Sequence, residues 1–131
     1  MFWECKLSEK KKLLIIQTSG IDTPERTAAP FYIATSAATM DVDVTIAFTI
    51  NGSTIVKKGA AEKIFVKEGS NQSLRVFLDQ AVENGVKLVI CHPSLELHDI
   101  KKEELIPEVK EIIGGAALVD MALEADRVLT F

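Results

Sequence analysis

Short apolar runs alternate with amphipathic segments along this chain. Five of the runs have the length and aliphatic content that predict buried strands, at residues 13–16, 42–50, 86–90, 109–113 and 127–131. Longer segments between them carry apolar residues at helical spacing and predict helices at residues 24–40, 70–83 and 116–125. Apolar strands that alternate with helices favour a parallel sheet covered by helices on both faces. The pattern therefore predicts an α/β fold.

Proline, asparagine and glycine indicate where these elements begin and end. Pro24 is well placed to open a helix, whereas Pro30 in the same segment predicts a kink or a later start. The pair Asn51-Gly52 has two interpretations. It often forms a tight hairpin turn, after which residues 54–56 would pair back as a strand. It fits equally a loop at the carboxyl edge of a parallel sheet, and the sequence leaves both open.

The composition is typical of a globular protein. Of the 131 residues, 47% are hydrophobic and 26% are charged, which allows a sizeable core. We expect a single domain over residues 1–131, with residues 1–11 as an N-terminal arm. The net charge of −4 argues against nucleic-acid binding as the main task. No segment reaches the roughly 18 apolar residues of a membrane span.

The cysteines and the N-terminal residues bear on the cellular compartment. The N-terminal residues do not form a signal peptide, and the two cysteines form no CxxC pair. We therefore expect the reducing cytoplasm rather than a disulfide scaffold. No four-ligand metal pattern is present, and neither a metal nor a cofactor is expected. Phe2 and Trp3 suggest that the arm packs against the body of the protein or a neighbouring subunit, and the nearby Cys5 is expected to have no catalytic role.

Cys91 is the strongest candidate for chemistry. It follows the strand predicted at residues 86–90 and precedes Pro93, which opens a short predicted helix. Sites in α/β sheets gather at strand carboxyl ends, and the positive end of a helix dipole favours a thiolate. The alternative is a small buried core residue. An imidazolium of His92 or His98 could support the thiolate, but His92 could also face away, and His98 could simply complement a helix dipole.

Small polar residues after the first predicted strand suggest an anion site. Thr18, Ser19 and Gly20 precede a predicted helix, where hydroxyl and backbone N–H groups can hold an anion. The alternative is an ordinary strand-to-helix turn. Asn51 and Gly52 close a neighbouring strand at the same predicted edge. They either line the same pocket or serve only to form the turn.

Several short motifs follow one another in the order and spacing of a known family. They extend from residue 12 to residue 131 and comprise Thr18-Ser19-Gly20, Pro24-Glu25-Arg26, Ala29-Pro30-Phe31, residues 44–48, Gly52, Lys58-Gly59, Gly85-Val86-Lys87, Cys91 and residues 123–131. Through these motifs the chain resembles the DsrE/DsrF-like family of small sulfur-trafficking proteins. The resemblance implies a three-layer α/β/α sandwich with a five-stranded parallel sheet. It also implies a homo-oligomer, usually a trimer, a hexamer or a dimer.

The resemblance further implies a role for Cys91. In sulfur-handling members, a cysteine at the matching position carries sulfur as a persulfide or a thiosulfonate. Some members have a second cysteine a few residues later, where this chain has Pro93, Ser94 and Leu95. The sulfur would therefore leave by transfer to the thiol of a partner protein.

These observations lead to one main hypothesis, a cytoplasmic sulfur carrier or sulfurtransferase. The Cys91 thiolate attacks a sulfane sulfur and later yields it to a sulfur-relay partner protein. Thr18, Ser19 and His92, with the backbone N–H groups at the helix amino end that Pro93 and Ser94 open, would hold the anionic end of small sulfur anions. A carrier also requires access, so Cys91 is predicted to be partly exposed, in a pocket near a subunit boundary.

Two alternatives belong to other classes. A non-catalytic oligomeric module would bind a small anion or a nucleotide at the same strand ends and would tolerate the loss of the Cys91 thiol. A thiol peroxidase would form a sulfenic acid on Cys91 and turn over with a reductant. The peroxidase ranks last because no resolving cysteine is close in the sequence.

Overall fold

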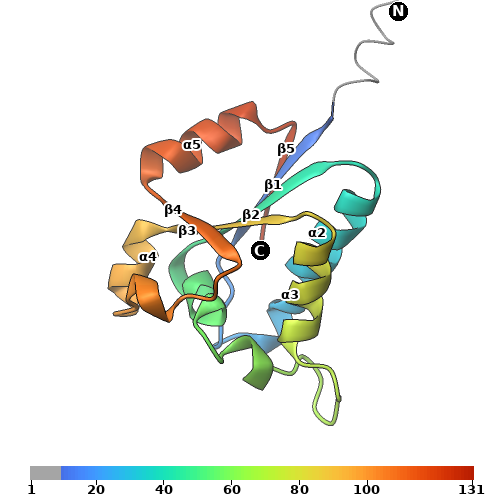
Figure 1. Ribbon diagram of the computed structural model, residues 1–131, viewed down its shortest axis with the longest axis vertical. Helices are drawn as coiled ribbons and strands as arrows, with labels where there is room; N and C mark the ends of the chain where they lie inside the picture. The colour runs from blue at the N-terminus through green and yellow to red at the C-terminus, as the bar shows by residue number, and fades with distance from the viewer. Residues whose placement is uncertain (1–9) are drawn as a thin grey trace, which may run out of the picture.

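Five parallel strands form the central sheet of the computed structural model, which describes residues 10–131 (Figure 1). They are β1 (Lys12–Gln17), β2 (Asp43–Phe48), β3 (Lys87–Cys91), β4 (Val109–Ile113) and β5 (Arg127–Thr130). Their order across the sheet is β4-β3-β2-β1-β5, and each pairs in parallel with its neighbours. The five apolar runs are thus confirmed as strands. Cys5 and most of the predicted arm lie outside the described residues.

Helices cover both faces of this sheet. α2 (Ala28–Thr39) and α3 (Leu74–Glu83) lie side by side on one face, and α5 (Gly115–Glu124) lies on the other (Figure 1). Connections between parallel strands are right-handed, so the helices that lead from β1 to β2 and from β2 to β3 share a face. The connection from β4 returns across the sheet to β5 and carries α5 over the opposite face. This is the three-layer sandwich that the resemblance implies.

The remaining elements are short. They are η1 (Pro24–Arg26), η2 (Ile50–Val56), η3 (Ala61–Lys63), α4 (His92–Leu97) and η4 (Lys102–Glu104). Asn51 and Gly52 lie in η2, so the hairpin interpretation is wrong and the loop at the carboxyl edge is correct. α2 begins at Ala28, which places Pro30 in its first turn, where the backbone N–H groups have no helical partner to lose. The later start is therefore the correct alternative.

Some predicted boundaries shift for local reasons. β2 ends at Phe48, two residues before the predicted end, because Ile50 has a φ of 55° and leaves the extended conformation. α3 begins at Leu74 rather than near residue 70, with Ser73 as its extended N-cap residue. The segment at residues 57–69, which has no predicted element, contains η3 and the buried side chain of Ile64.

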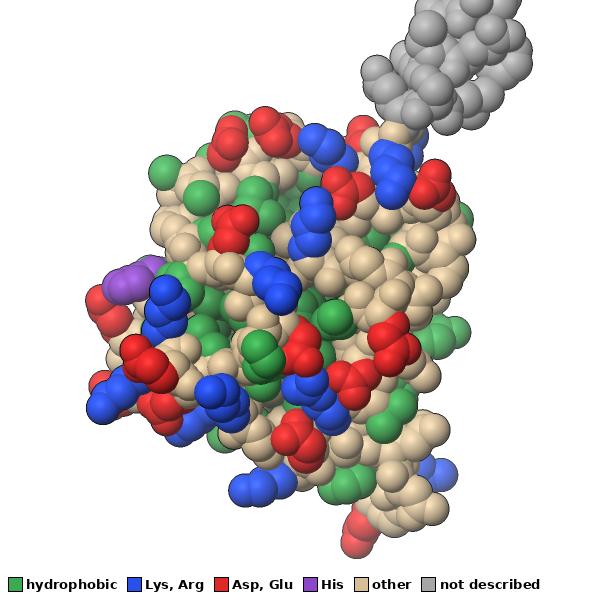
Figure 2. Space-filling model, in the orientation of Figure 1, with side chains coloured by type: hydrophobic (Ala, Val, Ile, Leu, Met, Phe, Trp, Pro, Cys, Tyr) green, Lys and Arg blue, Asp and Glu red, His purple; other side chains and the backbone are tan. Residues whose placement is uncertain are grey.

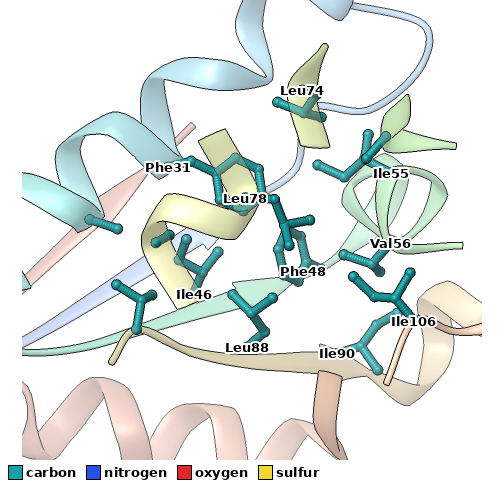
Figure 3. Close-up of a cluster of buried hydrophobic side chains, with 14 of the residues drawn as sticks. Phe31, Ile46, Phe48, Ile55, Val56, Leu74, Leu78, Leu88, Ile90 and Ile106 are labelled. Carbon is teal, nitrogen blue, oxygen red and sulfur yellow. The ribbon is translucent and has the colours of Figure 1, made fainter. Parts of the chain in front are cut away.

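The larger core lies between the sheet and the helices α2 and α3 (Figure 3). Phe31 of α2 and Phe48 of β2 meet there with ring centroids 5.9 Å apart. Leu78 of α3 and Leu88 of β3 are also almost completely buried. Full burial of an aliphatic or aromatic side chain contributes about 1.5–3 kcal/mol, so this face holds β2 and β3 firmly in place.

The layer beneath α5 is thinner. Its buried side chains belong to Leu14, Ala47, Val89, Cys91 and Ile113. α5 packs against them with partly buried side chains, and none of its own residues is buried. β5, at the edge of the sheet, is exposed along its whole length. Cys91 therefore lies on the less covered face of the sheet.

Candidate functional site

Cys91 lies at the carboxyl end of β3, between β2 and β4. It pairs with Ile113 of β4, and it is the N-cap residue of α4, with extended φ and ψ of −76° and 128°. Pro93 occupies the first turn of α4, and the Ser94 hydroxyl donates to the Cys91 carbonyl oxygen at 2.6 Å. The predicted placement of the thiol, after a strand and before a helix, is confirmed.

The thiol is buried among apolar side chains. Cys91 exposes 8% of its surface and belongs to the cluster beneath α5. Burial raises the pKa of the Cys91 thiol, because apolar surroundings disfavour the charged thiolate. The Cys91 pKa is thus raised, contrary to the expectation that the helix amino end lowers it, and α4 has only six residues. The expected partial exposure is also wrong, because α5 covers this cluster.

The residues after β1 donate their hydrogen bonds to backbone carbonyl oxygens of the protein. The Thr18 backbone N–H and hydroxyl donate to the Phe131 carbonyl oxygen at 2.6 and 2.8 Å, and the Ser19 N–H donates to the same oxygen at 3.3 Å. The Ser19 hydroxyl donates to the Arg26 carbonyl oxygen at 3.4 Å. An anion could use these groups only after the bonds break, so their role as anion ligands stays a prediction.

Gly20 and Gly52 interlock the loops that follow β1 and β2. A Cβ atom at Gly20 would lie 2.0 Å from the Asn51 carbonyl oxygen and 2.5 Å from Oγ1 of Thr54. A Cβ atom at Gly52 would lie 2.1 Å from the Gln17 carbonyl oxygen. Only glycine permits such close approaches. Packing of the two loops thus accounts for both glycines that the sequence placed in the candidate site.

Asn51 connects three segments at the carboxyl edge of the sheet. Its Nδ2 donates to Oδ2 of Asp22 at 3.0 Å, and its Oδ1 lies 3.1 Å from Nε2 of His98. The same His98 nitrogen lies 3.1 Å from the Ile50 carbonyl oxygen. Two acceptors around one nitrogen assign the proton to Nε2. His98 thus holds the η2 loop, in which Ile50 adopts a left-handed φ that is costly for a β-branched side chain.

His92 follows Cys91 in sequence but lies in a different environment. It is exposed on the first turn of α4, and its Nδ1 is 3.6 Å from Oε1 of the exposed Glu96. Contacts of this kind between exposed side chains contribute at most about 1 kcal/mol. The structure does not bring the His92 imidazole into the apolar cluster around the thiol. A hollow of ≈ 490 Å³ is lined by His92 and by charges of both signs, those of Glu96, Asp99, Lys101 and Lys102.

The surface charges show no dominant sign. Figure 2 shows acidic and basic side chains interspersed across the described part of one face of the molecule. Within residues 10–131, no three histidine, cysteine or acidic residues gather closely enough to hold a metal ion. None of the helices in the described part of the chain is long and apolar enough to cross a membrane.

Thr49 is a further residue of this edge, and no motif in the sequence points to it. Thr49 follows β2 in extended conformation, with φ −139° and ψ 162°, and its side chain is half-buried. In the sequence it is one polar residue in an apolar run. Its place in the molecule depends on which strand pairs with β2, and a single sequence does not show strand order.

Comparisons with known proteins agree with this architecture. The model of the DsrE/DsrF-like family matches residues 11–131. The uncharacterized protein MJ0760 of Methanocaldococcus jannaschii is 28% identical over 83% of this chain, which spans only 38% of that relative's length. The sulfur carrier protein DsrE2 of Allochromatium vinosum is 26% identical over 92% of this chain and 98% of its own length.

Two solved structures share the fold. The ychN protein from E. coli superposes with a TM-score of 0.74 at 20% identity, covering 94% of this chain and 100% of its own. MTH1491 from Methanobacterium thermoautotrophicum, a protein of unknown function, superposes with a TM-score of 0.60 at 8% identity and with the same coverage. Since the family model matches all but the first residue of the described chain, the protein belongs to the DsrE/DsrF-like family.

Proposed function

We propose that this protein is a cytoplasmic sulfur carrier that holds a sulfane sulfur on Cys91 and passes it to the thiol of a partner protein. One observation carries the proposal. Cys91, the single cysteine of residues 10–131, stands at the carboxyl end of β3, where α/β sheets place their sites. Family membership supports a role in sulfur trafficking. The relative from A. vinosum, which is named a sulfur carrier, supports it as well.

Each transfer step balances without an oxidant. The Cys91 thiolate attacks the outer sulfur of a donor persulfide, R–S–SH. The donor's S–S bond breaks, its R–S⁻ group leaves, and a new S–S bond forms on Cys91. An acceptor thiolate then attacks the outer sulfur and releases the Cys91 thiolate. One sulfur atom moves, and one S–S bond exists before and after each step.

The surroundings of Cys91 favour a persulfide over a thiosulfonate as the cargo. A persulfide adds a single sulfur atom, whereas a thiosulfonate adds a permanent anion with several oxygen acceptors. Burying an anion without hydrogen-bond donors is costly. The hydroxyls of Thr18, Ser19 and Ser94, which the sequence suggested as anion ligands, already donate to carbonyl oxygens. The apolar cluster around Cys91 suits the smaller cargo.

Assembly with further copies of the chain is part of the proposal. Val119 and Leu123 lie four residues apart on α5 and are 58% and 80% exposed. Residues at this spacing share one face of a helix, and adjacent exposed apolar side chains favour burial against a partner. Because α5 covers Cys91, an interface there would place the thiol near a subunit boundary.

Light scattering coupled to size-exclusion chromatography tests this assembly. We expect a mass that is a multiple of the 14.4 kDa chain, and we expect Leu123→Glu to shift the protein towards the single chain, because a charge at the centre of an apolar interface opposes association. Lys58→Glu, at an exposed position in another part of the fold, serves as the control. A native protein that elutes at the mass of one chain would overturn the assembly.

Intact-protein mass spectrometry after incubation with polysulfide tests the carrier function. We expect the native protein to gain the mass of one sulfur atom and to lose it on treatment with a reductant. Cys91→Ser should remove the adduct completely, because serine forms no persulfide. Cys5→Ser is the matched control and should load as the native protein does.

The outcomes of this experiment separate the candidate functions. An adduct that persists in Cys91→Ser, or no adduct on the native protein, contradicts the carrier. In the second case, small-anion or nucleotide binding that survives Cys91→Ser would favour the binding module. Sulfenic acid formed on Cys91 by peroxide, with turnover in the presence of a reductant, would favour the peroxidase.

A further inference from the structure

The pairing of β2 with β3 places a second side chain beside Cys91. Ala47 pairs with Val89 and Phe48 pairs with Ile90, so the next positions along the two strands are those of Thr49 and Cys91. Thr49 keeps the extended conformation, and its N–H donates to the Gln17 carbonyl oxygen at 3.0 Å. The ladder with β1 therefore continues through Thr49, one residue beyond the end of β2.

Thr49 and Cys91 also face the same side of the sheet. Successive residues of an extended strand point to opposite faces. Phe48 belongs to the core under α2 and α3, whereas Ala47 belongs to the cluster under α5. The Thr49 side chain therefore lies on the α5 face, as the Cys91 side chain does.

Cys91 has one neighbouring residue on each adjacent strand, and the two neighbours differ in chemistry. On the β4 side, Cys91 pairs with Ile113, which offers no hydrogen bond. On the β2 side lies Thr49, which carries a hydroxyl. Neighbouring strands are roughly 4.8 Å apart, so rotation about χ1 of Thr49 can bring its hydroxyl to the sulfur atom. The two side chains form no hydrogen bond in this structure, in which burial is the cause of the raised pKa of the Cys91 thiol.

The Thr49 hydroxyl is free to make this contact. Other hydroxyls at the same edge donate to carbonyl oxygens, that of Thr18 to Phe131 and that of Thr54 to Asn51. Among residues 10–131, none of the side-chain hydrogen bonds involves the Thr49 hydroxyl. A hydroxyl that donates to no protein group gains more from a charged acceptor than from a neutral one.

We propose that Thr49 is a positioning residue whose hydroxyl donates a hydrogen bond to the sulfur on Cys91. In the free protein the acceptor is the thiolate, and in the loaded protein it is the outer sulfur of the persulfide. An anionic sulfur in an apolar cluster needs at least one donor, and Thr49 supplies it from the neighbouring strand. The persulfide part rests on the proposed function, whereas the hydrogen bond to the thiolate stands without it.

Titration of the thiol in three Thr49 proteins tests the inference. In a Cys5→Ser background, the ultraviolet absorbance of the thiolate is followed against pH, and the signal of the Cys5→Ser, Cys91→Ser protein is subtracted. We expect Thr49→Val to raise the apparent pKa of Cys91 by about one unit, so that about tenfold less thiolate is present at a given pH below it. Thr49→Ser, which keeps the hydroxyl, should titrate as the parent protein does.

Thr45→Val is the control for removing a hydroxyl from the same strand. Thr45 is half-buried and shares a hollow with Met121 of α5, two rows away from Cys91. It should leave the titration unchanged. An unchanged titration in Thr49→Val, or an equal shift in Thr45→Val, would overturn the inference.

Sulfur loading, measured on the same proteins, keeps the two proposals apart. If Thr49→Val shifts the titration and the parent takes up no sulfur, the carrier function fails and the hydrogen bond stands. If the parent loads sulfur and Thr49→Val leaves the apparent pKa of Cys91 unchanged, the carrier function stands and the positioning role fails.

Discussion

Gly52→Ala is expected to lower the free energy of unfolding by roughly 3 kcal/mol or more, a large share of the stability of a small domain. The new Cβ would lie 2.1 Å from the Gln17 carbonyl oxygen. That oxygen also accepts the N–H of Thr49, which holds β1 against β2. The backbone cannot move aside without breaking this ladder. Because φ of Gly52 lies outside the left-handed region, the clash alone accounts for the effect.

Urea denaturation followed by circular dichroism measures this change. Gly114→Ala is the matched control, because a Cβ there meets nothing within 4 Å and its φ of −90° suits any residue. We expect Gly114→Ala to change stability by no more than about 0.5 kcal/mol. Gly20→Ala should resemble Gly52→Ala, since its Cβ would meet the Asn51 carbonyl oxygen. Equal midpoints for Gly52→Ala and Gly114→Ala would refute the interlocked loops.

Native Cys91 is expected to react with iodoacetamide about 100-fold more slowly than the same thiol in the unfolded chain, because the reagent must wait for a local opening of the structure. Cys91 exposes only 8% of its surface, and its raised pKa reduces the thiolate available at neutral pH. The reaction is followed by mass spectrometry in a Cys5→Ser background, with and without urea. Equal rates in the native and unfolded protein would show that the thiol is open to solvent.

The raised pKa of Cys91 also links stability to pH. The neutral thiol is favoured in the folded state, so its contribution to stability is fully present below the ordinary thiol pKa of about 8.5. The contribution is lost as the pH rises through the higher pKa of the folded protein. Stability should therefore decline on the alkaline side, and it should decline less in Cys91→Ala, in which other titrating groups are unchanged. Parallel pH profiles of the two proteins would contradict the pKa shift.

The sequence predicts the strands and the place of Cys91 because both depend on local pattern. Each apolar run is long enough for a buried strand, and Pro93 restricts the chain to a helix start just after Cys91. The burial of Cys91 could not be predicted in the same way. It results from the return of the chain from β4 to β5, which carries α5 across the opposite face of the sheet.

For the polar residues of the candidate site, too, the sequence indicates the chemistry but not the tertiary contacts. Thr18 and Ser19 have the chemistry of anion ligands, but tertiary contacts with the carbonyl oxygens of Phe131 and Arg26 engage their hydroxyls. Gly52 is a residue type that turns commonly use, yet its close approach to the Gln17 carbonyl oxygen depends on the neighbouring strand. Thr49 gives no local signal, and only the order of the strands places it beside Cys91.

The thin cover over Cys91 has a consequence for the timing of delivery. α5 packs on the cluster without burying any residue of its own, so a fluctuation of this one helix can admit an acceptor thiol. For the carrier proposed above, the frequency of that fluctuation would set a ceiling on the rate of sulfur release, which more acceptor could not raise. Between encounters, the same helix would keep small reducing thiols away from a sulfur held on Cys91. Storage lifetime and maximum delivery rate of the proposed carrier would thus be two readouts of a single conformational equilibrium.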